Sequence, residues 1–146
     1  MSLVNKSAPQ FSLPSTEGGN IISLGDFKNQ KVVLVFYPGD DTPVCTKQLC
    51  SYATGFEDFS NKGIVLLGIN QDTLDSHLKF KSKYKLPFPL LSDTDGKVCS
   101  EYGAKGLLGT KRATFIINEK GIITYEDFIF PFFFRNKTDI FKQLEK

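Results

Sequence analysis

Two continuous apolar runs stand out in the pattern of hydrophobic and polar positions along this chain. They cover residues 31–37 (KVVLVFY) and 64–69 (IVLLGI), and both are rich in β-branched and large aliphatic residues. Runs that do not alternate with polar residues are typical of strands buried on both faces of a sheet. Residues 90–92 (LLS) form a third, shorter candidate strand. The pattern therefore predicts a sheet whose central strands are covered on both sides.

Helical periodicity follows each of the two long apolar runs, because apolar residues recur there at spacings of three and four. The first helix is predicted from residue 43 to about residue 60. The second begins at Asp72 or Thr73, either of which can cap it, and ends near residue 84. Shorter helices are predicted over residues 97–102 and 138–146. The expected inner faces consist of Leu49, Tyr52, Phe56 and Phe59 on the first helix and of Leu74, His77, Leu78 and Tyr84 on the second.

Two β-hairpins complete the predicted elements. Residues 11–14 and 20–24 flank a Glu-Gly-Gly turn, and residues 113–117 and 122–127 flank a turn that ends in glycine. The glycine-rich segment 103–110 is expected to be a loop. The order of these elements indicates an α/β fold. A chain of 146 residues, 40% of them hydrophobic, is expected to form one compact domain over residues 1–146.

The candidate chemistry is concentrated where the first buried strand turns into the first helix. Pro38 and the glycine after it stop the strand, and Thr42 followed by Pro43 is typical of an N-cap and a first helical residue. Cys45 is then expected in the first helical turn, where unpaired N–H groups and the helix dipole favour an anion such as a thiolate. We therefore interpret Cys45 as a presented nucleophile rather than a small buried hydrophobe.

These residues carry a resemblance to a known family. Pro38, Thr42 and Cys45 reproduce the Pro-x-x-x-Thr-x-x-Cys pattern of peroxiredoxins, and the run FYPGDDTPVCTKQLC resembles the peroxiredoxin Q branch, also called bacterioferritin comigratory protein. In that branch a second cysteine follows the first by five residues, which is the position of Cys50 here. The resemblance implies a thioredoxin-like α/β fold, with a central mixed sheet, helices on both faces and an N-terminal β-hairpin.

The same resemblance implies a thiol-dependent peroxidase that reduces hydrogen peroxide and organic hydroperoxides. Cys45 would be oxidised to a sulfenic acid, which Cys50 would resolve through an intramolecular disulfide. Thr42 would offer its hydroxyl near the sulfur, serve as an N-cap, or do both, and Pro38 would shield the thiolate or simply end the strand. Arg112 matches the family's Arg-x-Thr/Ser-Phe pattern, unlike the lysine before it, and would stabilise the thiolate and orient the peroxide.

Helix geometry constrains the implied disulfide. Residues five apart on an intact α-helix have Cα atoms roughly 8 to 9 Å apart, beyond the roughly 7 Å limit for a disulfide. Pairing of Cys45 with Cys50 therefore requires the first turns of the helix to unwind, and we expect a folded and a locally unfolded form. Gln48 is expected to have a minor polar role in the pocket. Cys99 is expected to pack on a short helix, and His77 to be a surface or half-buried residue that this chemistry does not need.

Composition narrows the expected partners and location. The net charge is +2, from 18 basic and 16 acidic residues without a basic tract, which argues against nucleic acid and anionic membranes as partners. No signal-peptide core or membrane-spanning apolar run is present in the sequence, so a cytoplasmic protein is expected. The three cysteines and one histidine lack the paired spacing of a zinc site, so neither metal nor cofactor is expected. The resemblance implies thioredoxin or a similar dithiol as the reductant, and a monomer.

Two other functions compete with the peroxidase. A thioredoxin-type reductase would need Cys-x-x-Cys, whereas four residues separate Cys45 from Cys50, so this function is disfavoured. A redox-sensing or chaperone-like binding module, switched by Cys45 oxidation, would expose apolar surface such as residues 128–134. The run that contains this segment, FIFPFFFR, has five phenylalanines among eight residues, and core packing is favoured over a partner surface for it. Peroxide turnover with a thiol donor would distinguish the enzyme from the module.

Overall fold

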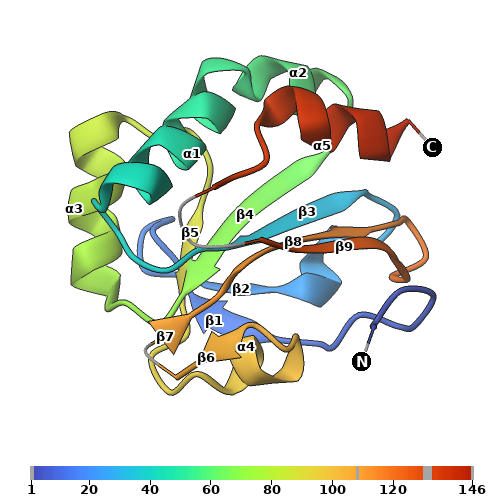
Figure 1. Ribbon diagram of the computed structural model, residues 1–146, viewed down its shortest axis with the longest axis horizontal. Coiled ribbons are helices and arrows are strands. Elements are labelled where there is room, and N and C mark those ends of the chain that lie inside the picture. Colours follow the sequence, from blue (N-terminus) through green and yellow to red (C-terminus); the bar gives the residue numbers. More distant parts are fainter. Residues whose placement is uncertain (1, 108, 130–132, 146) are drawn as a thin grey trace.

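A five-stranded mixed sheet of order β5-β4-β3-β8-β9 lies at the centre of the computed structural model, which describes residues 2–107, 109–129 and 133–145 (Figure 1). The middle strand β3 (Val32–Phe36) pairs in parallel with β4 (Val65–Asn70) and antiparallel with β8 (Arg112–Ile117). β5 (Leu90–Ser92) lies parallel to β4, and β9 (Ile123–Ile129) lies antiparallel to β8. All residues of β3 and β8 are buried. The predicted mixed sheet with fully buried central strands is therefore confirmed.

Alternate side chains of β3 point into two separate hydrophobic layers, as the pleat of a strand requires. Val33 and Val35 pack in the layer that holds Cys45, while Leu34 and Phe36 pack in the layer that holds Cys99. The sheet therefore separates these two cysteines. The helices that cover the Cys45 side are α1 (Pro43–Thr54), α2 (Phe56–Asn61), α3 (Leu74–Tyr84) and α5 (Lys137–Leu144) (Figure 1).

The other face of the sheet is covered by the N-terminal region and α4 (Lys97–Glu101). The predicted N-terminal hairpin is confirmed and consists of β1 (Ser12–Pro14) and β2 (Ile21–Ser23), followed by the short 3-10 helix η1 (Leu24–Phe27). The expected glycine-rich loop contains a small hairpin of its own, β6 (Lys105–Gly106) with β7 (Gly109–Thr110). Helices thus lie on both faces, as the thioredoxin-like fold requires.

The first predicted helix is wrong in its length, because it is two helices. α1 ends at Thr54 and α2 begins at Phe56. Gly55 lies between them, and its N–H is directed to the carbonyl oxygen of Ala53 instead of continuing the α-helical ladder. The side chain of Lys137 fills the space beside this glycine, since a Cβ added there would collide with the lysine Cδ. The interruption lets the start of α5 approach closely.

The inner face of α3 also differs from the expectation. Thr73 caps the helix by accepting a hydrogen bond from the Ser76 amide at 3.2 Å, which confirms one of the two predicted caps. Leu78 is 42% exposed, so its placement on the inner face was wrong. His77 is fully buried, which confirms its predicted place on the inner face, whereas the expectation of a surface or half-buried histidine was wrong. Both of its ring nitrogens face oxygen atoms inside the protein, which is why burial is tolerated.

The phenylalanine-rich segment lies only partly within the described residues, because residues 130–132 fall outside them. Phe128 belongs to β9 and packs edge-on against the buried Phe115, with ring centroids 5.7 Å apart, yet it is 44% exposed. Phe133 is 60% exposed. Core packing is therefore wrong for Phe133 and holds only in part for Phe128. Within the described ranges, no helix is both long enough and apolar enough to cross a membrane.

Candidate active site

The turn after β3 delivers Cys45 to the first turn of α1. Asp41 adopts a left-handed backbone conformation, with φ of 57°, and Thr42 returns to an extended one, with φ of −87° and ψ of 152°. Pro43 then opens the helix, as the sequence predicts, and its fixed φ suits the first helical position. Cys45 is the third residue of α1, and the residue has no exposed surface. Its thiol therefore lies at the positive end of the helix, shielded from water.

Arg112 is the charged residue that contacts the sulfur. Its Nη2 donates a hydrogen bond to Cys45 Sγ at 3.1 Å, and its Nη1 donates to Oε1 of Gln48. The arginine opens β8, whose next residue pairs with Phe36 at the end of β3, so the sheet register brings it beside the start of α1. Arg112 is buried, whereas the neighbouring Lys111 is exposed. The guanidinium thus contacts the sulfur at a place that little water reaches, since both residues are buried.

A chain of hydrogen bonds continues from Gln48 along one face of α1. Gln48 Nε2 donates to the Tyr52 oxygen at 3.0 Å, and the Tyr52 hydroxyl donates to the carbonyl oxygen of Arg135 at 2.5 Å. Cys45, Gln48 and Tyr52 are spaced three and four residues apart, so they share this face. Burial raises the pKa of Tyr52 far above its ordinary value, so the hydroxyl remains a neutral donor. The chain holds the Gln48 amide oxygen toward Arg112.

Sequence reasoning missed the polar role of Tyr52, which it assigned only to the apolar stripe. A usable signal was present, because a glutamine and a tyrosine follow the cysteine at helical spacing. By contrast, Gln48 lies where a polar pocket residue was expected and is buried.

The structure places Thr42 and Pro38 in the loop before α1. Thr42 occupies the N-cap position, but its side chain makes no capping hydrogen bond. Its hydroxyl donates instead to the Gly39 carbonyl oxygen at 3.0 Å, and the residue is exposed. Pro38 is half-buried and directly follows the buried Tyr37. The arrangement thus brings Cys45 together with an arginine and a glutamine, while the threonine hydroxyl is engaged within the loop.

All three cysteines are free thiols. Cys50 lies in α1, is half-buried, and burial raises the pKa of its thiol. Cys99 lies in α4 on the opposite face of the sheet, where burial and a hydrogen bond with Asp93 raise the pKa of its thiol to about 12. The Asp93 carboxylate also accepts the Cys99 amide at 2.7 Å. Cys99 is a packed residue on a short helix, as expected.

A mixed sheet of this order, with a cysteine in the first helical turn after its central strand, defines a thioredoxin-like fold of the peroxiredoxin kind. The AhpC/TSA family matches residues 4–126, and the chain belongs to this family. It is similar to a bcp peroxiredoxin of Coxiella burnetii, with 46% identity over 129 residues that cover 83% of this chain and 85% of the relative. The resemblance to the peroxiredoxin Q branch is confirmed.

Plant relatives and solved structures agree with this assignment. The chloroplastic peroxiredoxin Q of Oryza sativa subsp. japonica is 43% identical over 122 residues, which cover 82% of this chain but only 56% of that protein. The mitochondrial 2-Cys peroxiredoxin of Plasmodium falciparum superposes with a TM-score of 0.89 at 27% identity, covering 98% and 92% of the two chains. Reduced 2-Cys peroxiredoxin of Plasmodium vivax shares the fold, with a TM-score of 0.91, 24% identity, and coverage of 99% and 95%. The family and these relatives support a thiol peroxidase function.

Proposed function

We propose that this protein reduces hydrogen peroxide and organic hydroperoxides through a sulfenic acid at Cys45, which Cys50 resolves as an intramolecular disulfide. The observation that carries the proposal is the 3.1 Å contact between Arg112 Nη2 and the Sγ of Cys45, a fully buried residue in the first helical turn. A buried cysteine that packed only as a small hydrophobe would gain nothing from a buried guanidinium. A thiolate nucleophile gains its counter-ion.

The proposed oxidation is a two-electron transfer. The Cys45 thiolate attacks one peroxide oxygen, the sulfur–oxygen bond forms as the O–O bond breaks, and the other oxygen leaves as hydroxide or alkoxide. That oxygen takes a proton and departs as water or alcohol. Arg112 stays cationic throughout, so it can stabilise charge first on the sulfur and then on the leaving oxygen. Gln48 holds the guanidinium in place through its amide oxygen.

Thr42 and Pro38 are proposed to shape the entry to the sulfur. The Thr42 hydroxyl currently donates to Gly39, so it must release that carbonyl before it can donate to a peroxide. Its oxygen lone pairs remain free to accept a hydrogen bond from the peroxide in the present conformation. Because Cys45 has no exposed surface, peroxide reaches the sulfur only when neighbouring side chains move.

The proposed disulfide step requires α1 to unwind. The sulfenic acid of Cys45 condenses with the Cys50 thiol, forming the S–S bond and releasing water. Both residues lie in the continuous helix Pro43–Thr54, where the distance between positions five apart exceeds what a disulfide spans. Unwinding also removes the burial that raises the Cys50 pKa, so the resolving thiol ionises more readily in the unwound form. The same motion thus brings the sulfurs together and activates the second one.

The reductant, the location and the oligomeric state are also proposals. Thioredoxin or a similar dithiol would reduce the disulfide by thiol exchange. We propose that the chain acts in the cytoplasm as a monomer, with residues 1–146 as one domain, and without metal or cofactor. Neither nucleic acid nor a membrane is a proposed partner.

Mass spectrometry after one equivalent of hydrogen peroxide tests the proposal. The reaction is quenched in acid, the protein is unfolded, and free thiols are alkylated and mapped. We expect a disulfide between Cys45 and Cys50 in the wild type, and a trapped sulfenic acid at Cys45 in Cys50→Ser. Cys99→Ser is the matched control, because it removes a thiol on the far face of the sheet, and it should behave as the wild type does.

Different results would contradict the peroxidase function and the role of Cys50. If Cys45 stays reduced and alkylatable in the wild type, the peroxidase proposal fails, and a binding module becomes the better hypothesis. If Cys45 is oxidised but the disulfide forms with Cys99 instead, the assignment of Cys50 fails alone. Turnover with thioredoxin, its reductase and NADPH then separates a catalytic cycle from a single oxidation event.

A further inference from the structure

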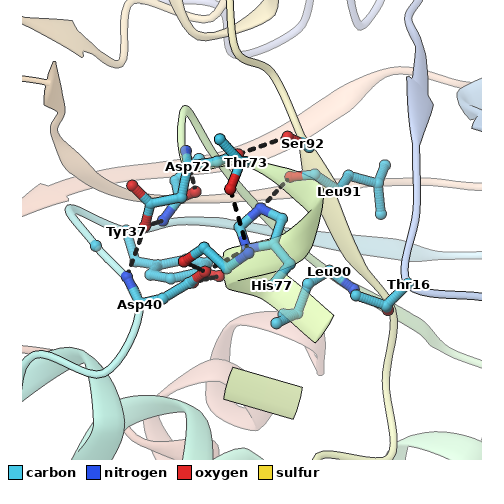
Figure 2. A network of polar contacts seen from close by, with 12 residues as sticks. Thr16, Tyr37, Asp40, Asp72, Thr73, His77, Leu90, Leu91 and Ser92 are labelled. Atoms are coloured by element: carbon cyan, nitrogen blue, oxygen red, sulfur yellow. Dashed lines mark hydrogen bonds and ion pairs between the residues drawn. The ribbon is translucent and has the colours of Figure 1, made fainter. Parts of the chain in front are cut away.

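A buried polar network lies beside the loop that leads into α1, and the proposed chemistry does not use it. His77 and Asp40 are at its centre, with their side chains 0% and 4% exposed (Figure 2). Asp40 belongs to the loop between β3 and α1, five residues before Cys45, whereas His77 belongs to α3. The network therefore joins the loop that presents the cysteine to a helix outside the site.

Asp40 is the acceptor of this network. Its Oδ1 accepts the Tyr37 hydroxyl at 2.7 Å, and its Oδ2 lies 2.7 Å from both the Ser76 hydroxyl and His77 Nδ1. Its backbone amide donates to Asp72 Oδ2, also at 2.7 Å. Figure 2 shows Tyr37, the residue after β3, and His77 of α3 meeting at Asp40. A buried carboxylate with this many donors is held in one position.

His77 makes two different contacts with its two ring nitrogens. Nε2 lies 2.9 Å from the Leu91 carbonyl oxygen in β5, which can only accept, so Nε2 carries a proton. Nδ1 faces the Asp40 carboxylate, whose two oxygens already accept the Tyr37 and Ser76 hydroxyls. His77 therefore contacts the loop through Nδ1 and the sheet edge through Nε2, and one rigid ring ties the two together.

A second anchor follows at the next residue. Asp41 Oδ2 accepts from Lys83 Nζ and its Oδ1 from the Tyr84 hydroxyl, both at 2.8 Å. These two partners also belong to α3. The side chains of both aspartates are thus bound to the same helix, and together they fix the backbone just ahead of Thr42 and Pro43. The position of Cys45 depends on this fixed start, because it is only the third residue of α1.

We propose that His77 is a positioning residue for Cys45, which acts through Asp40 by fixing the loop of residues 37–42 to α3. This inference rests on the proposed peroxidase function for its kinetic consequence, but the fixing of the loop does not. A loosened loop lets the first turn of α1 shift, so Cys45 Sγ leaves the 3.1 Å contact with Arg112 for part of the time. Oxidation then slows although every residue that touches the sulfur is intact.

Two substitutions separate the contacts of His77. In His77→Asn the side-chain Nδ2 occupies the place of the ring Nδ1, so the hydrogen bond to Asp40 is kept and that to Leu91 is lost. In His77→Gln the longer side chain retains a donor for the Leu91 carbonyl and loses the one for Asp40. Both variants remove the ring, so a difference between them reports the bond to the loop. Asn136→Ala is a further control, because it removes the side-chain cap of α5, away from the loop.

Two readouts are measured in the reduced protein. Hydrogen exchange, followed by peptide-resolved mass spectrometry, reports the motion of residues 39–47 without any peroxide chemistry. The second-order rate constant of Cys45 oxidation is measured in the Cys50→Ser background. We expect His77→Gln to exchange at least tenfold faster in this segment and to be oxidised at least tenfold more slowly. His77→Asn should stay within threefold of the parent in both readouts, and Asn136→Ala should match the parent.

The outcomes test the positioning role of His77 separately from the proposed peroxidase function. If His77→Gln and His77→Asn exchange equally fast in the segment, the positioning role is overturned, whatever the enzyme does. If the segment loosens only in His77→Gln while Cys45 oxidation keeps its parental rate, the role in positioning Cys45 is overturned as well. If wild-type Cys45 is not oxidised at all, the proposed function fails, and the exchange data still decide whether His77 fixes the loop.

Discussion

Replacing Arg112 with methionine should slow the oxidation of Cys45 by hydrogen peroxide about 100- to 1000-fold. Methionine keeps an unbranched stem but removes both donors and the charge. The lost contact is a charge-assisted hydrogen bond to the sulfur at 3.1 Å, in a site where Arg112 and Cys45 are both buried. Removing one preorganised donor of this type from a reacting centre costs about 2.7 to 4 kcal/mol in the transition state, which corresponds to the stated range.

The geometry also predicts an intermediate result for Arg112→Lys. One ammonium cannot donate along both of the arginine's directions, to Cys45 Sγ and to Gln48 Oε1, with the same planar fork. The charge remains, so we expect a loss of about tenfold, less than for methionine. In Arg112→Met the Gln48 oxygen loses its donor inside the protein, which should lower the free energy of unfolding by about 1 to 3 kcal/mol.

The assay is rapid acid quench followed by mass spectrometry of Cys45 in the Cys50→Ser background, over a range of peroxide concentrations. Lys111→Met is the matched control, because it removes one positive charge from the adjacent exposed residue. It should change the rate constant by less than twofold. Circular dichroism and urea titration establish that each variant is folded at the assay temperature. Equal rates for Arg112→Met and Lys111→Met would refute the reasoning, since they would make the contact with the sulfur irrelevant.

Three further predictions follow from single contacts. Burial raises the pKa of Cys50 in the folded helix, so Cys50 ionises first in the unwound form as pH rises through the ordinary cysteine range. The folded helix therefore loses stability in that range. Disulfide formation, measured by acid quench, should accelerate from about pH 8 to pH 10. Cys99, with its pKa raised to about 12, should stay unmodified by iodoacetamide at about pH 8 while Cys50 reacts, as peptide mapping will show. Gly68→Ala would place a Cβ 2.8 Å from Leu90 Cδ2 and 3.3 Å from Tyr37 Cε1, and should cost about 1 to 3 kcal/mol in urea unfolding.

The parts of the fold that sequence predicts well are those encoded by neighbouring residues. The buried strands β3 and β4 follow from continuous apolar runs, which need no knowledge of their partners. The start of α1 follows from a threonine and a proline at adjacent positions, and this also places Cys45 in the first turn. Such signals act over a few residues, so they survive without the tertiary structure.

The features that sequence did not predict depend on contacts between distant residues. The side chain of Lys137 from α5 occupies the space beside Gly55, where α1 ends, and no local pattern reveals this contact. His77 looked like an isolated histidine, because its partner Asp40 lies 37 positions earlier in the chain. Helical periodicity placed both His77 and Leu78 on the inner face of α3 but could not tell that only the histidine is buried. A polar side chain is buried only where hydrogen-bond partners are available, and these partners come from distant parts of the folded chain.

The contacts of the site fall into two groups, and this division bears on where the proposed unwinding of α1 would begin. Asp40 and Asp41 are bound to side chains of α3, and these contacts do not involve α1. Cys45 and Gln48 are held by Arg112 from the sheet, and those bonds exist only while α1 is helical. In the proposed mechanism, oxidation changes the sulfur that the guanidinium contacts, so it should weaken the second group and leave the first intact. Unwinding should therefore begin after the fixed loop, at the extended Thr42, and spread toward Cys50.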